Sequence, residues 1–198
     1  MSHGCDGFEF DVRYTRDRRA VLCHDPKIGR MEVATTDYTG LERRRGYTLA
    51  CLEDVLFRFG ATAWLDIELK VSGEEEVVSS LLAAHLPQCG YVVSSFLPDV
   101  LLRLREIDPS LPLGYICERP EDVERWTSLP INMFIPHYSL VSRHLVDDVH
   151  ARRMQVLTWT VNSREELLLL AVWGVDGLIS DDPKLLVETF PQKLTASE

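Results

Sequence analysis

The regular alternation of strand-like and helix-like segments is the feature that most limits how this chain can fold. Short runs alternate apolar and polar residues with period two, and segments with the 3.6-residue period of an amphipathic helix lie between them. Seven runs are predicted to be the main strands, namely 7–14, 63–70, 90–95, 113–117, 132–136, 155–161 and 177–180. Strands separated by helices of this length form parallel βαβ units, which indicates an α/β protein.

The boundaries of several predicted helices are marked by capping residues. Thr48 is the expected N-cap of a helix that ends at 60, and Ser72 with Glu75 has the spacing of a capping box. Ser163 with Glu166 has the same spacing before a leucine-rich segment that ends at a glycine. Further helices are expected at 98–107, 121–126 and 143–152, and a short strand is expected at 19–24.

The number of predicted strands falls one short of a closed barrel. A (β/α)₈ barrel has eight parallel strands and about 250 residues, whereas this chain has 198 residues and begins directly in a strand. We therefore predict an α/β fold, a TIM-like (β/α)₈ barrel that lacks its first βα unit. Because no long polar or Gly/Ser-rich stretch divides the chain, residues 1–198 are expected to form a single domain.

Charge and cysteine content limit the partners and the compartment. The formal net charge is −10, from 31 acidic and 21 basic residues, which argues against attraction to a nucleic-acid backbone or an anionic membrane. The five cysteines show no CxxC spacing and favour reduced thiols, so a cytoplasmic location is predicted. No run of 18 apolar residues occurs, and no transmembrane segment is expected.

Charged residues occupy alternate positions inside two otherwise apolar strands. Glu9 and Asp11 share one face of the first strand, and Glu68 and Lys70 share one face of the second. An unpaired charge is costly on a buried face, and a hard cation such as Mg²⁺ or Ca²⁺ takes carboxylate oxygens as ligands. The competing interpretation is that these strands are half exposed and that the charges face water or pair with one another.

His24 is the histidine with the most informative position. It follows a short strand and precedes the turn at Asp25, so it could act as a general acid or base, or simply face solvent. Among the other histidines, only His137 follows a predicted strand and is a candidate to line a site. From the residues alone, Trp159 is predicted to be a core residue and Asn162 a loop residue.

Seven short motifs, in this order along nearly the whole chain, resemble the glycerophosphodiester phosphodiesterase family. They are Cys5-Asp-Gly-Phe-Glu-Phe-Asp-Val12, His24-Asp-Pro26, Thr48-Leu-Ala-Cys-Leu-Glu-Asp-Val-Leu56, Ile67-Glu-Leu-Lys70, Ser94-Ser-Phe96, Trp159-Thr-Val-Asn162 and Val175-Asp-Gly-Leu-Ile-Ser-Asp181. Each motif is short, and it is their shared order that makes the resemblance specific.

The resemblance implies a TIM barrel that uses a divalent cation, Mg²⁺ or Ca²⁺. It would hydrolyse glycerophosphodiesters, such as glycerophosphocholine, to an alcohol and glycerol 3-phosphate. By position, Glu9, Asp11 and Glu68 look like the metal ligands. The resemblance also implies that Lys70 faces the substrate phosphate and that His24 is the second catalytic histidine. Trp159 would form a wall of the glycerol-side pocket.

The sequence also departs from the family pattern. The family opens with a strand bearing His-Arg-Gly and continues with a Glu-Asn-Thr segment, and neither motif occurs here. We therefore expect an N-terminally truncated member with impaired activity and two unpaired barrel edges, which a homo-oligomer could cover. The alternatives are an inactive member that binds a phosphate ligand or a metal, or acts as a scaffold, and a relative of the phosphoinositide-type or spider-toxin phospholipases.

Overall fold

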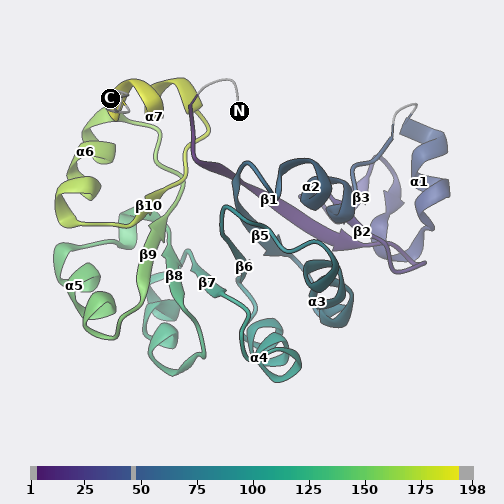
Figure 1. Cartoon of the computed structure of the whole chain (residues 1–198), viewed down its shortest axis with the longest axis horizontal. Helices are drawn as coiled ribbons and strands as arrows, with labels where there is room; N and C mark the ends of the chain where they lie inside the picture. The colour runs from purple at the N-terminus through teal and green to yellow at the C-terminus, as the bar shows by residue number, and fades with distance from the viewer. Residues whose placement is uncertain (1–3, 46–47, 192–198) are drawn as a thin grey trace.

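A single curved sheet with helices along its outer side forms the main body of the protein (Figure 1). The computed structural model describes residues 4–45 and 48–191. Its seven parallel strands lie in the order β10 (Gly177–Leu178), β9 (Gln155–Thr158), β8 (Met133–Pro136), β7 (Leu113–Cys117), β6 (Tyr91–Ser95), β5 (Trp64–Leu69) and β1 (Gly7–Tyr14). β2 (Ala20–Leu22) adds an antiparallel edge beyond β1.

A helix follows nearly every parallel strand, as the sequence pattern predicts. The connecting helices are α2 (Leu52–Phe59), α3 (Glu75–Ala84), α4 (Pro98–Ile107), the 3₁₀ helix η2 (Pro120–Ser128), α5 (Arg143–Ala151), α6 (Arg164–Trp173) and α7 (Pro183–Thr189). A further short 3₁₀ helix, η3 (Tyr138–Leu140), lies between β8 and α5. Within the described residues β1 and β10 do not pair, so the barrel stays open there. The predicted fold class, a TIM-like α/β barrel with seven main parallel strands, is confirmed.

Residues between β1 and α2 form a small lobe, of which the sequence pattern predicted only the short strand at 19–24. It contains β2, β3 (Lys27–Ile28), β4 (Met31–Glu32), the 3₁₀ helix η1 (Val33–Thr35) and α1 (Tyr38–Arg45), seen at the right of Figure 1. Its strands have only two or three residues each, too few for a clear period. The lobe has its own apolar cluster, formed by Val21, Ile28, Val33, Tyr38, Leu41, Leu49 and Cys51.

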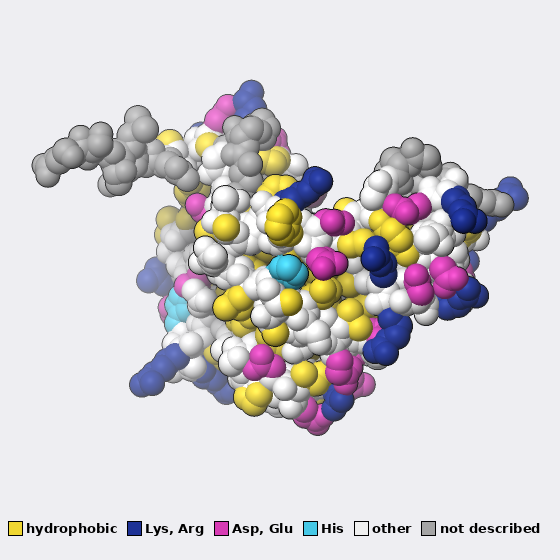
Figure 2. All heavy atoms as spheres, turned by 45° about the vertical axis from the view of Figure 1, so that its right-hand side comes forward, with side chains coloured by type: hydrophobic (Ala, Val, Ile, Leu, Met, Phe, Trp, Pro, Cys, Tyr) yellow, Lys and Arg dark blue, Asp and Glu magenta, His cyan; other side chains and the backbone are white. Residues whose placement is uncertain are grey.

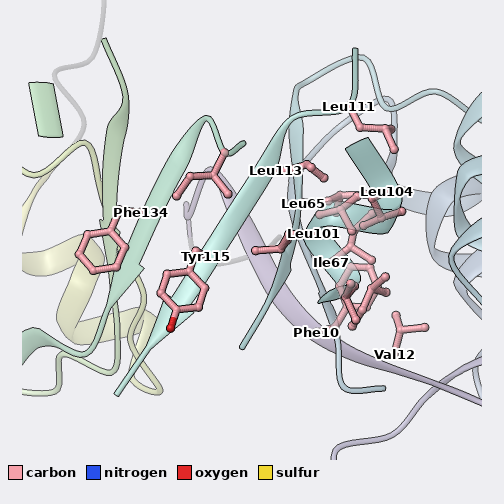
Figure 3. Packing of buried hydrophobic residues seen from close by; sticks show 14 of the residues in the cluster. Phe10, Val12, Leu65, Ile67, Leu101, Leu104, Leu111, Leu113, Tyr115 and Phe134 are labelled. Carbon is pink, nitrogen blue, oxygen red and sulfur yellow. The ribbon is translucent and has the colours of Figure 1, made fainter. Parts of the chain in front are cut away.

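Alternate strand residues enter two separate apolar layers. Side chains on the outer face of the sheet pack against the helices, as Figure 3 shows for Phe10 of β1, Leu65 of β5 and Leu104 of α4. Side chains on the inner face form a second cluster inside the open barrel, built around Val92, Ile116, Ile135 and Leu157. Polar residues on this inner face are therefore shielded by the barrel wall.

Two predicted helix starts are wrong. α2 begins at Leu52 with Cys51 as N-cap, not at Thr48, because the preceding residues are extended and the Ala50 carbonyl accepts a hydrogen bond from the Leu22 N–H of β2. α3 likewise has Glu74 rather than Ser72 as N-cap.

One further predicted helix start is correct, and one predicted strand end is too late. The Ser163 box is confirmed: the Ser163 hydroxyl accepts from the Glu166 N–H at 3.3 Å and donates to its carboxylate at 2.8 Å. β9 ends at Thr158 rather than 161, because Trp159 pairs only through an isolated bridge to His137.

Candidate active site

Three carboxylates meet where β1 and β5 run side by side. The parallel register sets Glu9 opposite Asp66 and Asp11 opposite Glu68, so the inward-facing acids of both strands lie on one wall of the barrel. The candidate ligand oxygens of Glu9, Asp11 and Glu68 lie within 4.8 Å of one another. Carboxylates at this spacing could share one hard divalent cation.

Lys70 lies directly after β5 and places its ammonium group against two of these acids. Its Nζ is 2.9 Å from Asp11 Oδ1 and 2.5 Å from Glu68 Oε1. The lysine is largely buried, so these ion pairs are shielded from solvent. One positive charge therefore faces three clustered carboxylates, and Glu9 Oε1 is buried without a hydrogen-bond partner among the described residues.

Burial raises the pKa of three carboxyl groups on this wall. It raises the pKa of Glu9 to about 8, with further increases from Asp11, Asp66 and Glu68, and it raises the pKa of Asp66 to about 7. The pKa of Glu68 is also raised by burial, although its hydrogen bond to Lys70 opposes the shift. A bound divalent cation would favour the charged forms, so the residues present fit such a group.

Cation binding is expected to strengthen as the pH rises towards 8. The Glu9 pKa moves from 4.5 to about 8 on folding, so the metal-free fold loses stability over this window as the pH rises. A cation must displace the retained proton at low pH but not above about 8. Calorimetry should thus show a larger increase in Tm from CaCl₂ or MgCl₂ at about pH 8.5 than at about pH 6. Equal increases at both pH values would contradict this.

A cavity of about 520 Å³ opens at the carboxyl ends of the strands and contains all the predicted site residues. In parallel barrels, the loops at this end carry the functional groups. On the face shown in Figure 2, acidic side chains lie next to a histidine near the centre. The predicted residues that line the cavity are Glu9, Asp11, His24, Glu68, Lys70 and Trp159.

His24 lies at the rim of this cavity. It follows β2 in a bend, its side chain is exposed, and its Nδ1 is 3.0 Å from Asp25 Oδ1. The Arg13 side chain donates to the His24 carbonyl at 2.9 Å, which ties the loop to β1. The small lobe therefore holds the histidine over the carboxylates while leaving its ring accessible.

Trp159 forms part of an aromatic wall across the cavity. Its ring lies edge-on to Phe96, with centroids 5.6 Å apart, and its Nε1–H donates to the Ile135 carbonyl at 3.0 Å. Lys70 Nζ lies 5.6 Å from the centroid of the Phe96 ring. The ring of His137 packs edge-on to that of Trp159, with centroids 5.4 Å apart. His137, which the sequence made a candidate to line a site, is not among the described residues that line the cavity.

The structure adds acidic residues that sequence reasoning missed. Glu118 follows β7 and Asp181 follows β10, and both line the cavity. The Asn162 side chain, predicted to lie in a loop, donates to Asp181 at 3.0 Å and accepts from the Ser180 hydroxyl. The sequence could have indicated Glu118 and Asp181 as site residues, because each follows a predicted strand at the end where barrel sites lie.

An open parallel barrel with clustered carboxylates and a lysine at its mouth is the arrangement of a barrel enzyme that acts on a charged substrate. The comparison with known families identifies which one. Residues 1–185 match the glycerophosphoryl diester phosphodiesterase family, and the chain belongs to that family of phosphoric diester hydrolases.

Curated and solved relatives agree with this family. The chain is 28% identical to a glycerophosphodiester phosphodiesterase of Bacillus altitudinis, over 95% of this chain and 87% of that protein. It superposes with a TM-score of 0.81 on a glycerophosphodiester phosphodiesterase from Thermotoga maritima, with 20% identity, covering 94% of this chain and 86% of that one. A second structure, of a phosphodiesterase from Oleispira antarctica, was solved with the product sn-glycerol-3-phosphate. The chain superposes on it with a TM-score of 0.80 at 23% identity, covering 95% of this chain and 86% of that one.

The sequence predicted no transmembrane segment. Across the described ranges, no helix combines the length and the apolar character that a membrane span requires.

Proposed function

We propose that this protein hydrolyses glycerophosphodiesters to an alcohol and glycerol 3-phosphate with the help of a divalent cation, Mg²⁺ or Ca²⁺. The observation that carries the proposal is the trio of Glu9, Asp11 and Glu68 beside Lys70, in a cavity that His24 also lines. Membership of the family supports the reaction class. The substrate would be a small molecule that enters the cavity at the carboxyl ends of the strands.

Each site residue has a role that its surroundings support. Glu9, Asp11 and Glu68 would hold the cation, which when bound supplies positive charge against a phosphate oxygen. Burial lowers the pKa of Lys70, but its hydrogen bonds to Glu68 and Asp11 outweigh this and raise the pKa above its ordinary value. The lysine therefore stays protonated and can face the phosphate group.

His24 and Trp159 would complete the substrate site. The exposed ring of His24 can accept or donate a proton at the mouth, as the attack on phosphorus or the departure of the alcohol requires. Trp159 and Phe96 present an apolar wall against which the carbon chain of glycerol can lie. His24 is the one histidine among the described residues that line the cavity, so we expect slow turnover.

Replacing His24 by alanine should lower glycerophosphocholine hydrolysis by about 10²–10⁴-fold, the usual contribution of a general acid or base. The assay is release of glycerol 3-phosphate with MgCl₂ or CaCl₂, which EDTA should abolish. His144→Ala is the matched control, because this exposed histidine lies on α5, outside the described lining of the cavity, with its Nε2 3.5 Å from Asp148 Oδ2. Full activity in His24→Ala would remove this residue from the mechanism.

Since His24 is the one histidine that lines the cavity in the part of the chain that the structure describes, a second candidate function is also favoured, a non-catalytic family member that binds a phosphate ligand and a cation. This candidate requires cation binding without any release of glycerol 3-phosphate at high protein concentration. Metal-dependent release that His24→Ala eliminates would exclude it.

We further propose a cytoplasmic location. In support, the five cysteines are odd in number and show no CxxC spacing, which favours reduced thiols. Assembly into a homo-oligomer that covers the open barrel edge stays a prediction, which sedimentation of the purified protein would test.

A further inference from the structure

The position of the His24 ring depends on the main chain that carries it. The side chain is 73% exposed, and its Nδ1 lies 3.0 Å from Oδ1 of Asp25, the next residue along the chain. Because Asp25 belongs to the same bend and moves with it, this contact orients the ring but does not hold the bend over the carboxylates. The contacts that fix the bend relative to β1 therefore decide where the proposed acid or base lies.

Hydrogen bonds join this bend to β1, the strand that carries Glu9 and Asp11. The Cys23 N–H donates to the Asp11 carbonyl at 3.0 Å, just beyond the last residue pair of β1 and β2. One residue further along, the His24 carbonyl accepts from Arg13 Nε at 2.9 Å. The first bond needs only the main chain, whereas the second needs the side chain of Arg13.

The period of β1 places Arg13 for this contact. Glu9, Asp11 and Arg13 alternate along the strand and so share its inner face. Arg13 is paired with Val21 of β2, which is fully buried in the apolar cluster of the small lobe. The main chain of Arg13 is thus held by the sheet, and its side chain extends that support to the exposed bend.

A small movement of the bend is enough to change reactivity. A general acid or base must lie within about 2.6–3.2 Å of the group whose proton it moves. A displacement of about 1 Å can lower a rate by about 10²-fold. Residues 24–27 are all exposed, so core packing does not set the position of the bend. A hydrogen bond from a cationic donor is about twice as strong as one between neutral groups, and it is suited to this task.

We propose that Arg13 is a positioning residue for His24, whose ring it holds over the carboxylate trio through the hydrogen bond to the His24 carbonyl. The inference rests on the proposed hydrolysis, in which His24 moves a proton. Arg13 is not among the described residues that line the cavity, so its effect passes through the bend and not through contact with the substrate.

Two substitutions of similar length separate the hydrogen bond from the charge. Arg13→Gln places an amide N–H as many bonds from the main chain as Nε, whereas Arg13→Met places a methyl group there, and both remove the positive charge. Arg13→Met should lower kcat for glycerophosphocholine by about 10–100-fold with little change in KM. Arg13→Gln should stay within about 3-fold of the unmodified protein, because it keeps a neutral donor. Equal losses in the two variants would assign the effect to the charge and overturn the proposal.

The dependence on His24 gives a second kinetic test. In a His24→Ala background, Arg13→Met should change the remaining rate by no more than about 2-fold, because no ring is left to position. A further loss of about 10-fold in this background would show that Arg13 acts on the substrate or the cation directly, which would also overturn the proposal.

Amide exchange of the substrate-free protein tests the same contact without hydrolysis. By NMR, Arg13→Met should speed exchange of the Cys23 N–H by about 10-fold or more, because the loosened bend frees this group from Asp11, while Arg13→Gln should change it by about 2-fold at most. Exchange at Ile67, fully buried in β5, should be the same in all three proteins and shows that the fold is intact. Unchanged exchange at Cys23 in Arg13→Met would contradict the proposal. Because no substrate is present, this result stands even if the protein hydrolyses no glycerophosphodiester.

Discussion

Replacing Glu68 by glutamine is expected to weaken binding of Mg²⁺ or Ca²⁺ by on the order of 100-fold or more. Losing a group that merely supports a metal ligand typically costs about 10–100-fold, and Glu68 is predicted to be a ligand itself. It is the most buried of the three acids, at 6% exposure, so solvent cannot replace its charge. The substitution keeps the size of the side chain and leaves Lys70 paired with Asp11 at 2.9 Å.

Isothermal titration calorimetry of the purified protein measures this affinity directly. Glu118→Gln is the matched control, because Glu118 lines the same cavity and loses the same charge but is exposed and lies outside the carboxylate trio. Its affinity should change only a few-fold, as expected for a screened surface charge. Similar losses in the two variants would mean that overall charge at the mouth, rather than a defined site, attracts the cation.

Replacing Phe134 by alanine is expected to destabilise the fold by about 3–5 kcal/mol. Phe134 of β8 is fully buried, and its ring stacks between those of Tyr115 of β7 and Trp126 of η2. The distances between ring centroids are 6.1 Å to Tyr115 and 5.9 Å to Trp126. Figure 3 shows its ring beside Tyr115 in the layer between sheet and helices. Removing the ring loses apolar burial and leaves a cavity between two aromatic neighbours that cannot collapse into it.

Urea denaturation gives this free energy of unfolding from the shift of the midpoint at constant slope. The control is Phe57→Ala, because the Phe57 side chain of α2 is 80% exposed and the change should stay within about 0.5 kcal/mol. A loss below about 1 kcal/mol in Phe134→Ala would show that this layer repacks readily. It would then not hold β8 against η2.

The sequence predicted the strands of the barrel because their burial imposes a strong pattern. β5 and β7 are covered on both faces, and their bounds agree with prediction to within a residue or so. Where the local pattern left a helix boundary ambiguous, contacts with residues distant in sequence set that boundary. The Thr48 cap failed because the Leu22 N–H of β2, distant in sequence, bonds to Ala50 and keeps that stretch extended. Apart from the strand at 19–24, the small lobe escaped prediction, because β3 and β4 have only two residues each and are too short to show a period.

The sequence alone determined which side chains could meet at the candidate site, since Glu9, Asp11 and Glu68 alternate within apolar strands and motif order gave the family. Only the tertiary structure decided that these oxygens lie within 4.8 Å of one another, because their distance depends on the register between β1 and β5. The same holds for the buried Asp66 Oδ2, because a linear pattern cannot show that it has no hydrogen-bond partner among the described residues. Periodicity records which face of a strand a residue occupies, whereas pairing between distant strands decides what it faces.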